Sequence, residues 1–160
     1  MGVLCDVYIA DQERAMKYSF RGKCKCKSWK TCKCWDEYDP KTYDCIESRR
    51  IYTDDFAQLL SILRGKMHNQ SAVKEFEMVE QFSDMGPWIQ KVPDDLARLL
   101  AAATSEELRS ITEKWIKTMK MLGPKRSENI SLILDYLKLL QDLSEKSIKK
   151  EQKMYLWTCL

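Results

Sequence analysis

Residues 127–160 decide the fold, and they read SENISLILDYLKLLQDLSEKSIKKEQKMYLWTCL. From Ser127 to about Lys149 the apolar residues recur at helical spacing, and on a helical wheel they cover an arc of roughly 220°. A surface helix needs an apolar stripe of only about 100°. We therefore expect this helix to sit centrally, with contacts on two or three of its sides. Met154–Leu160 is apolar on both alternating faces, which predicts a strand.

A second strand with two apolar faces is predicted at Val3–Ala10. A strand of this kind needs cover on both faces, so we expect both strands near the middle of one sheet. Asp11 is a good cap for a short helix that reaches Tyr18. The chain is therefore predicted to be α+β and to form a single domain over residues 1–160. Its small mixed or antiparallel sheet includes both chain termini, with about four helices packed mainly on one side.

The remaining elements follow from capping and breaking residues. Helices are predicted to begin at Thr53, at Pro93 and after Thr104, where Glu107 completes a capping box. Gly65 is predicted to end the first of these helices. The other expectations are a weak strand in Cys45–Tyr52, a loop over 66–72, a strand around Glu75–Val79 with a helix as the alternative over 73–82, and an extended segment at Trp88–Val92.

Composition excludes several classes of protein. A net charge of +3 is too small to indicate nucleic-acid binding by itself, and no apolar run is long enough for a transmembrane helix. The N-terminus does not show the charged and apolar regions of a signal peptide, so a cytoplasmic location is expected. Seven cysteines without an export signal argue against a disulfide framework. Nothing in the pattern indicates an oligomeric state.

Four of the cysteines form one cluster in a Cys/Lys-rich segment, which is predicted to be a hairpin at about residues 20–36. The pattern is C-x-C, five residues, C-x-C, formed by Cys24, Cys26, Cys32 and Cys34. In a hairpin centred on Trp29, alternation places the four thiols on one face and the lysines on the other.

Three hypotheses remain open for this cluster. Four thiolates suit a tetrahedral Zn²⁺ at about 2.3 Å, and the neighbouring lysines would lower the thiol pKa values. The second hypothesis is a redox-labile pair such as a cross-strand disulfide. The third is a polar hairpin whose cysteines share no chemistry.

The same segment is the one strongly basic run, in which lysines are interleaved with Trp29 and Trp35. This pattern also suits nucleic acid, but the acids from Asp36 onward weaken that interpretation. Candidate binding residues are Trp29 and Lys30 here and Trp88 after Gly86-Pro87. For Trp88 the alternative is an anchor that packs its loop onto the core.

No catalytic constellation is visible. His68 is the one histidine and lies in a polar stretch, and no nucleophile elbow, phosphate-binding glycine loop or pair of metal-binding histidines occurs. The acidic pairs at Asp54, Asp94 and Glu106 fall at helix starts, where capping and dipole effects explain them. We therefore assign no catalytic residue and lean towards a protein that is not an enzyme.

Three short motifs carry a resemblance. They are Met1-Gly2 before a strand, Gly86-Pro87-Trp88 followed by Val92-Pro93-Asp94-Asp95-Leu96, and the ending Tyr155-Leu156-Trp157-Thr158-Cys159-Leu160. Together they resemble a family of small bacterial cytoplasmic proteins that has no established activity. The resemblance covers the first strand and roughly residues 85–160, and it implies no catalytic residue or cofactor. The Cys/Lys segment is not part of the family's pattern.

These observations give two expectations about function. The first is a non-enzymatic cytoplasmic protein that acts by contact with another protein, as an immunity or accessory factor. The immunity role is an analogy with small bacterial α+β proteins and rests on architecture alone. The alternative is a thiol-based zinc-binding or redox-responsive module that uses Cys24, Cys26, Cys32 and Cys34. An enzyme that uses His68 is a distant third.

Overall fold

The computed structural model describes residues 4–18, 43–49, 51–66, 70–81, 87–119 and 129–159. Within these ranges five strands form one antiparallel sheet in the order β2-β1-β5-β4-β3. The strands are β1 (Leu4–Ala10), β2 (Cys45–Arg49), β3 (Glu77–Gln81), β4 (Trp88–Lys91) and β5 (Lys153–Cys159). The helices are α1 (Gln12–Lys17), α2 (Thr53–Leu63), η5 (Gln70–Glu75, a 3₁₀ helix), α3 (Asp94–Ala102), α4 (Ser105–Thr118) and α5 (Ile130–Lys149). The predicted α+β fold is confirmed.

The two terminal strands lie next to each other in the middle of the sheet. β5 is the central strand, and β1 pairs with it from Leu4–Cys159 to Ala10–Lys153. Both strands carry buried side chains on both of their faces. The expectation that a strand with two apolar faces becomes a central strand is confirmed.

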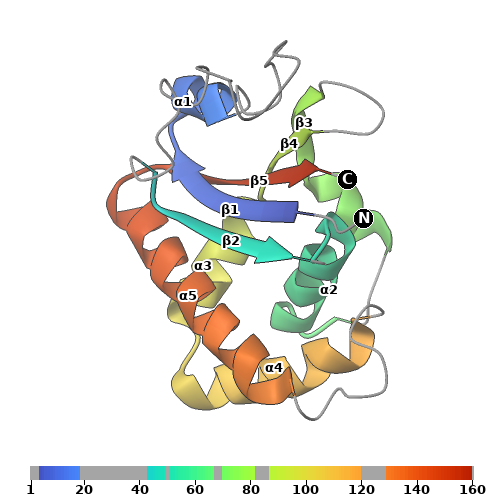
Figure 1. Cartoon of the computed structure of the whole chain (residues 1–160). Coiled ribbons are helices and arrows are strands. Elements are labelled where there is room, and N and C mark those ends of the chain that lie inside the picture. Colours follow the sequence, from blue (N-terminus) through green and yellow to red (C-terminus); the bar gives the residue numbers. More distant parts are fainter. Residues whose placement is uncertain are drawn as a thin grey trace, which may run out of the picture.

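The helices are distributed unequally over the two faces of this sheet. In Figure 1, α2, α3, α4 and α5 lie on one side of the sheet and α1 lies on the other. We call these two sides the helix face and the α1 face. Val7, Leu156 and Met154 belong to the buried cluster of the helix face, whereas Tyr8 and Tyr155 belong to that of the α1 face. The predicted packing of helices mainly on one side is therefore also confirmed.

The long helix differs from its prediction in its surroundings. α5 begins at Ile130 with Asn129 as its N-cap, and Ser127, the expected start of the helix, lies outside the described residues. The side chains of Leu137 and Leu140 are fully buried, but Leu132 is 65% exposed and Leu139 is 52% exposed. Contact on more than one side is found, since α3, α4 and the sheet all contact α5, but the apolar arc is not covered in full. The described elements that pack on α5 leave these two leucines uncovered.

The segment predicted as loop and then strand begins with a short helix instead. The 3₁₀ helix η5 occupies Gln70–Glu75, and the strand predicted around Glu75–Val79 is found at Glu77–Gln81. The helical turn places Ala72 and Phe76, four residues apart, in the core of the helix face. Burial of these two side chains explains the shift of the strand.

The predicted helix boundaries agree with the structure elsewhere. Thr104 caps α4, since the Glu107 amide donates to the Thr104 hydroxyl at 3.2 Å and the Glu107 carboxylate accepts from the Thr104 amide at 2.7 Å. Gly65 follows α2 with a positive φ of 64°. Among the helices that the structure describes, none is both long and apolar enough to cross a membrane.

Candidate binding surfaces

Most of the residues singled out in the sequence lie outside the described ranges. This holds for Trp29, Lys30, His68 and the cysteines Cys24, Cys26, Cys32 and Cys34, and therefore for the predicted hairpin. Trp88 is described: it is half-buried and is the first residue of β4, opposite Thr158 of β5. Among the described residues, no three His, Cys, Asp or Glu side chains are placed to hold a metal ion.

Cys5 is a buried thiol held in a polar cluster on the helix face. Burial raises the pKa of its thiol to about 12, and the Thr158 hydroxyl donates to its sulfur at 3.8 Å. The Ser48 hydroxyl donates to the Cys5 carbonyl at 2.7 Å. Burial also raises the pKa of the nearby Tyr136 phenol. Both groups therefore stay neutral near neutral pH, which does not favour a nucleophilic role for the Cys5 thiol.

One side of α5 is open to solvent and carries apolar residues. We call Leu132, Asp135, Leu139, Asp142 and Lys146 the outer α5 surface. All five are exposed, and at 100° per residue they share one side of the helix. The two leucines lie seven residues apart, with charged side chains on either side of them. A rigid helix with this pattern can dock against another protein.

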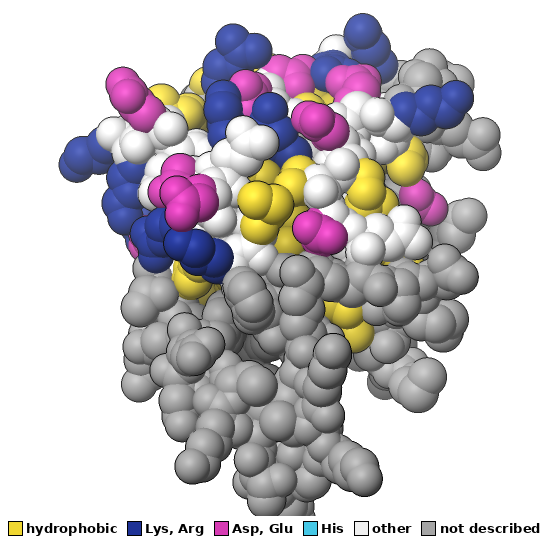
Figure 2. Space-filling view, turned by 90° about the horizontal axis from the view of Figure 1, so that it is seen from above, with side chains coloured by type: hydrophobic (Ala, Val, Ile, Leu, Met, Phe, Trp, Pro, Cys, Tyr) yellow, Lys and Arg dark blue, Asp and Glu magenta, His cyan; other side chains and the backbone are white. Residues whose placement is uncertain are grey.

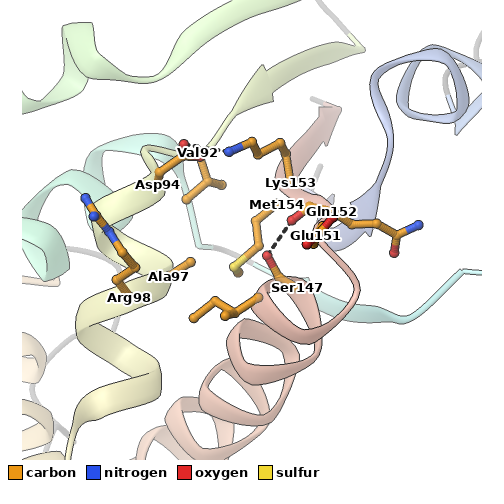
Figure 3. A pocket seen from close by; sticks show the side chains of 10 residues that line it. Val92, Asp94, Ala97, Arg98, Ser147, Glu151, Gln152, Lys153 and Met154 are labelled. Carbon is orange, nitrogen blue, oxygen red and sulfur yellow. Dashed lines mark hydrogen bonds and ion pairs between the residues drawn. The ribbon is translucent and has the colours of Figure 1, made fainter.

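A pocket of about 410 Å³ lies where α3 begins, α5 ends and β5 begins (Figure 3). Its floor consists of the buried side chains of Val92, Ala97 and Met154, and Ile148 lines its rim. A volume of this size lies at the lower end of the range for small-molecule sites.

Four charged residues line this pocket, and two of them neutralise each other. The Lys153 ammonium forms an ion pair with the Asp94 carboxylate at 2.7 Å, linking the start of β5 to the start of α3. Arg98 lines the pocket from α3, and Glu151 lines it from the turn after α5. Figure 3 shows these two residues on opposite sides of the apolar floor, with the guanidinium of Arg98 turned away from Met154. Neither of them forms an ion pair with any described residue.

The turn that holds Glu151 is a Schellman motif. The amide of Glu151 donates to the Ile148 carbonyl at 3.1 Å, and the amide of Gln152 donates to the Ser147 carbonyl at 3.0 Å. The Ser147 hydroxyl also donates to the Gln152 carbonyl at 2.7 Å. Glycine usually occupies the left-handed position of this motif. Here it is Glu151, with a φ of 54°, which is the one positive φ of a non-glycine residue in the described ranges.

Charge is mixed on the described part of the face that Figure 2 shows. Figure 2 looks at the side of the molecule that is uppermost in Figure 1, and on its described part lysines and arginines alternate with acidic side chains. This described part of the surface therefore does not form the single-sign patch that nucleic-acid binding requires.

A comparison of the chain with protein-family models, with curated proteins and with solved structures found no match in any of the three. The resemblance noted from the three short motifs therefore stays a prediction. The arguments about function that follow depend on the chemistry and the exposure of the residues themselves.

Proposed function

We propose that the protein is a non-enzymatic interaction factor that binds another protein through the outer α5 surface. The observation that carries this proposal is the exposure of Leu132 and Leu139 on a helix whose opposite side is packed into the core. Such a partner-bound role includes that of an immunity or accessory factor. The proposed setting is the cytoplasm, where the cysteines of the chain would stay reduced.

The energetics of burial support this surface. Burying a fully exposed leucine side chain contributes about 1.5–3 kcal/mol. Leu132 and Leu139 are 65% and 52% exposed, so covering each would contribute roughly half of that, and the two together form an energetic centre for an interface. Asp135, Asp142 and Lys146 surround them with charges of both signs, which favour one partner orientation over others. The buried side of α5 holds the helix in place, so little conformational entropy is lost on binding.

The test is a capture experiment with matched variants. The double variant Leu132→Gln/Leu139→Gln removes the two apolar side chains, and Met78→Gln changes an apolar residue of the edge strand β3 that is 48% exposed. A partner captured by the wild type is expected to be lost with the double variant and retained with Met78→Gln. The free energy of unfolding of both variants is expected to stay within about 0.5 kcal/mol of the wild type, because the side chains are exposed.

Two results would contradict the proposal. One is a partner that binds the double variant as tightly as it binds the wild type. The other is turnover of a small molecule by the purified protein with no partner present.

The second candidate function is the thiol-based module, and the C-x-C-x₅-C-x-C pattern itself favours it. If it is correct, protein purified under reducing conditions carries about one zinc per chain, as a tetrahedral four-thiolate site requires. Changing Cys26 and Cys32 to serine then removes the zinc, whereas changing Cys5 to serine does not. Metal-free protein whose clustered thiols do not respond to oxidant rejects this candidate.

A further inference from the structure

Of the four charged residues that line the pocket between α3 and α5, two form an ion pair with each other and two do not. The Asp94–Lys153 ion pair closes one side of the pocket and leaves no net charge there. Arg98 and Glu151 carry opposite charges on opposite walls, and the described part of the chain provides neither with an ionic partner. Val92, Ala97 and Met154 form the apolar surface between them. The pocket thus presents one cationic wall, one apolar floor and one anionic wall.

The left-handed backbone of Glu151 indicates that placing a glutamate at this position costs conformational free energy. A non-glycine residue in the left-handed region costs roughly 1–2 kcal/mol, and the Schellman turn here could be formed by glycine without that cost. Residues held in such conformations cluster at ligand sites. The turn places a carboxylate at the mouth of the pocket, which a glycine could not provide.

We propose that this pocket binds a small aliphatic zwitterion, with the carboxylate of the ligand at Arg98, its ammonium group at Glu151 and its alkyl chain on the Val92–Met154 floor. The fit requires charges at the two ends of the molecule, because the two walls lie on opposite sides of the floor. An ω-amino carboxylate has this form, and glycine does not, because its charges flank a single carbon.

This chemistry occurs in two biological sources. Free lysine carries an ε-ammonium group at one end of an alkyl chain and a carboxylate at the other, and a lysine at the C-terminus of a peptide carries the same two groups. L-Lysine and the tripeptide acetyl-Gly-Gly-Lys distinguish these sources. Tighter binding of L-lysine identifies a free amino acid as the ligand, and tighter binding of the tripeptide identifies a peptide terminus. Both results support a zwitterion site.

The test uses the whole protein labelled with ¹³C at the methionine methyl groups. Met154 lies at the pocket floor, and the other seven of the eight methionines report on effects elsewhere. 6-Aminohexanoate is expected to shift the Met154 signal in a saturable manner. Hexanoate, hexylamine and glycine are expected to bind at least about tenfold more weakly, because each lacks one end charge or the spacing between them.

Variants of Arg98 and Glu151 test the contribution of each charged wall to ligand binding. Arg98→Gln and Glu151→Gln are each expected to weaken 6-aminohexanoate binding at least about tenfold. The charge-swap double variant, Arg98→Glu with Glu151→Arg, is expected to restore binding, because the ligand can turn end for end. Arg109→Gln and Glu113→Gln, which change exposed residues of α4, serve as matched controls and are expected to bind as the wild type does.

The absence of a saturable Met154 shift with 6-aminohexanoate would overturn the inference. Equal binding of hexylamine or hexanoate, or unchanged binding by Arg98→Gln and Glu151→Gln, would also overturn it. The Leu132→Gln/Leu139→Gln variant is expected to bind the zwitterion normally. The proposal of a zwitterion site in the pocket and the proposal of a protein-binding outer α5 surface can therefore be tested independently.

Discussion

The two faces of the central sheet are stabilised by different chemistry. The helix face packs mostly aliphatic side chains from four helices, such as Leu96, Leu137 and Leu140, on β1 and β5. The α1 face packs rings instead: Tyr8 stacks on Tyr18 with ring centroids 3.9 Å apart, and further ring contacts come from Tyr43, Tyr155 and Trp157. Aliphatic packing depends on shape, whereas the tyrosine cluster also depends on directed hydrogen bonds.

The hydrogen bonds of the α1 face position a helix too short to be stable alone. α1 has six residues, and isolated helices of that length are unstable in water. The Tyr8 hydroxyl donates to the Ala15 carbonyl at 3.0 Å, and the Tyr43 hydroxyl donates to the Arg14 carbonyl at 3.1 Å. A small element can thus be positioned by a few directed bonds where little apolar surface is available.

The largest expected effect tests the aliphatic face. Leu140→Ala, at a fully buried position of α5, should lower the free energy of unfolding by about 3 kcal/mol, through lost burial and a residual cavity. Leu139→Ala changes the preceding residue, which is half-exposed, and should cost less than about 1 kcal/mol. Urea unfolding of the two variants checks this, and equal losses would mean that α5 is packed on both sides.

The second prediction tests the directed bonds of the α1 face. The Tyr18 hydroxyl donates to the buried Asp6 carboxyl group at 2.8 Å, so Tyr18→Phe should cost about 2 kcal/mol, because it removes a hydrogen-bond partner from a buried polar group. Tyr155→Phe removes a hydroxyl that bonds to no described residue, and it should change stability by less than about 0.5 kcal/mol. Equal costs in thermal unfolding would show that ring packing alone stabilises this face.

The third prediction concerns the turn that leads from α5 on the helix face into the central strand. Glu151→Gly should raise the free energy of unfolding by about 1 kcal/mol, because it relieves the left-handed backbone at this position. Glu151→Ala removes the same carboxylate but keeps the backbone strain, and should not stabilise. A loss of stability in Glu151→Gly would show that the carboxylate itself stabilises the turn.

The smallest effect concerns an ion pair that connects the two faces. Asp44 follows Tyr43 of the α1 face and accepts from Lys146 of α5 at 3.0 Å and from Lys150, the C-cap residue of α5, at 2.6 Å. These two lysines lower the pKa of the Asp44 carboxyl below its ordinary 3.8. The pair therefore contributes stability above 3.8 and loses it as the pH falls through the lowered value.

The Asp44→Asn variant checks this contribution. It should be less stable than the wild type by about 0.5 kcal/mol at neutral pH, since the lysines are half-exposed. The difference should vanish in strong acid and shrink at high salt. A difference that persists at low pH would point to packing rather than charge.

The elements of the helix face could be predicted from local patterns. Strands with two apolar faces require cover on both sides, which places β1 and β5 in the centre of the sheet without knowledge of their partners. The cap at Thr104 and the break at Gly65 act within one turn of the chain, and both agree with the structure. The exposure of Leu132 and Leu139 could not be predicted, because the apolar arc of a helix does not show which of its sides the other elements of the fold will cover.

The tyrosine cluster and the pocket could not be predicted for the same reason. Tyr8, Tyr43 and Tyr155 come together only through the sheet, and each looks ordinary in its own segment. The pocket joins segments 92–98 and 147–154, which share no motif. One local signal was available, since Glu151 follows a long predicted helix at a place where glycine or asparagine is usual.

The pairing of Leu4 with Cys159 has a consequence for how the chain folds during synthesis. β1 leaves the ribosome well before its neighbour β5, because every other element of the described fold lies between them in the sequence. Until β5 emerges, the sheet lacks its central strand, and one long edge of β1 is open to pairing with other chains. Folding is therefore expected to be slow, because the contacts between β1 and β5 are the most distant in the sequence.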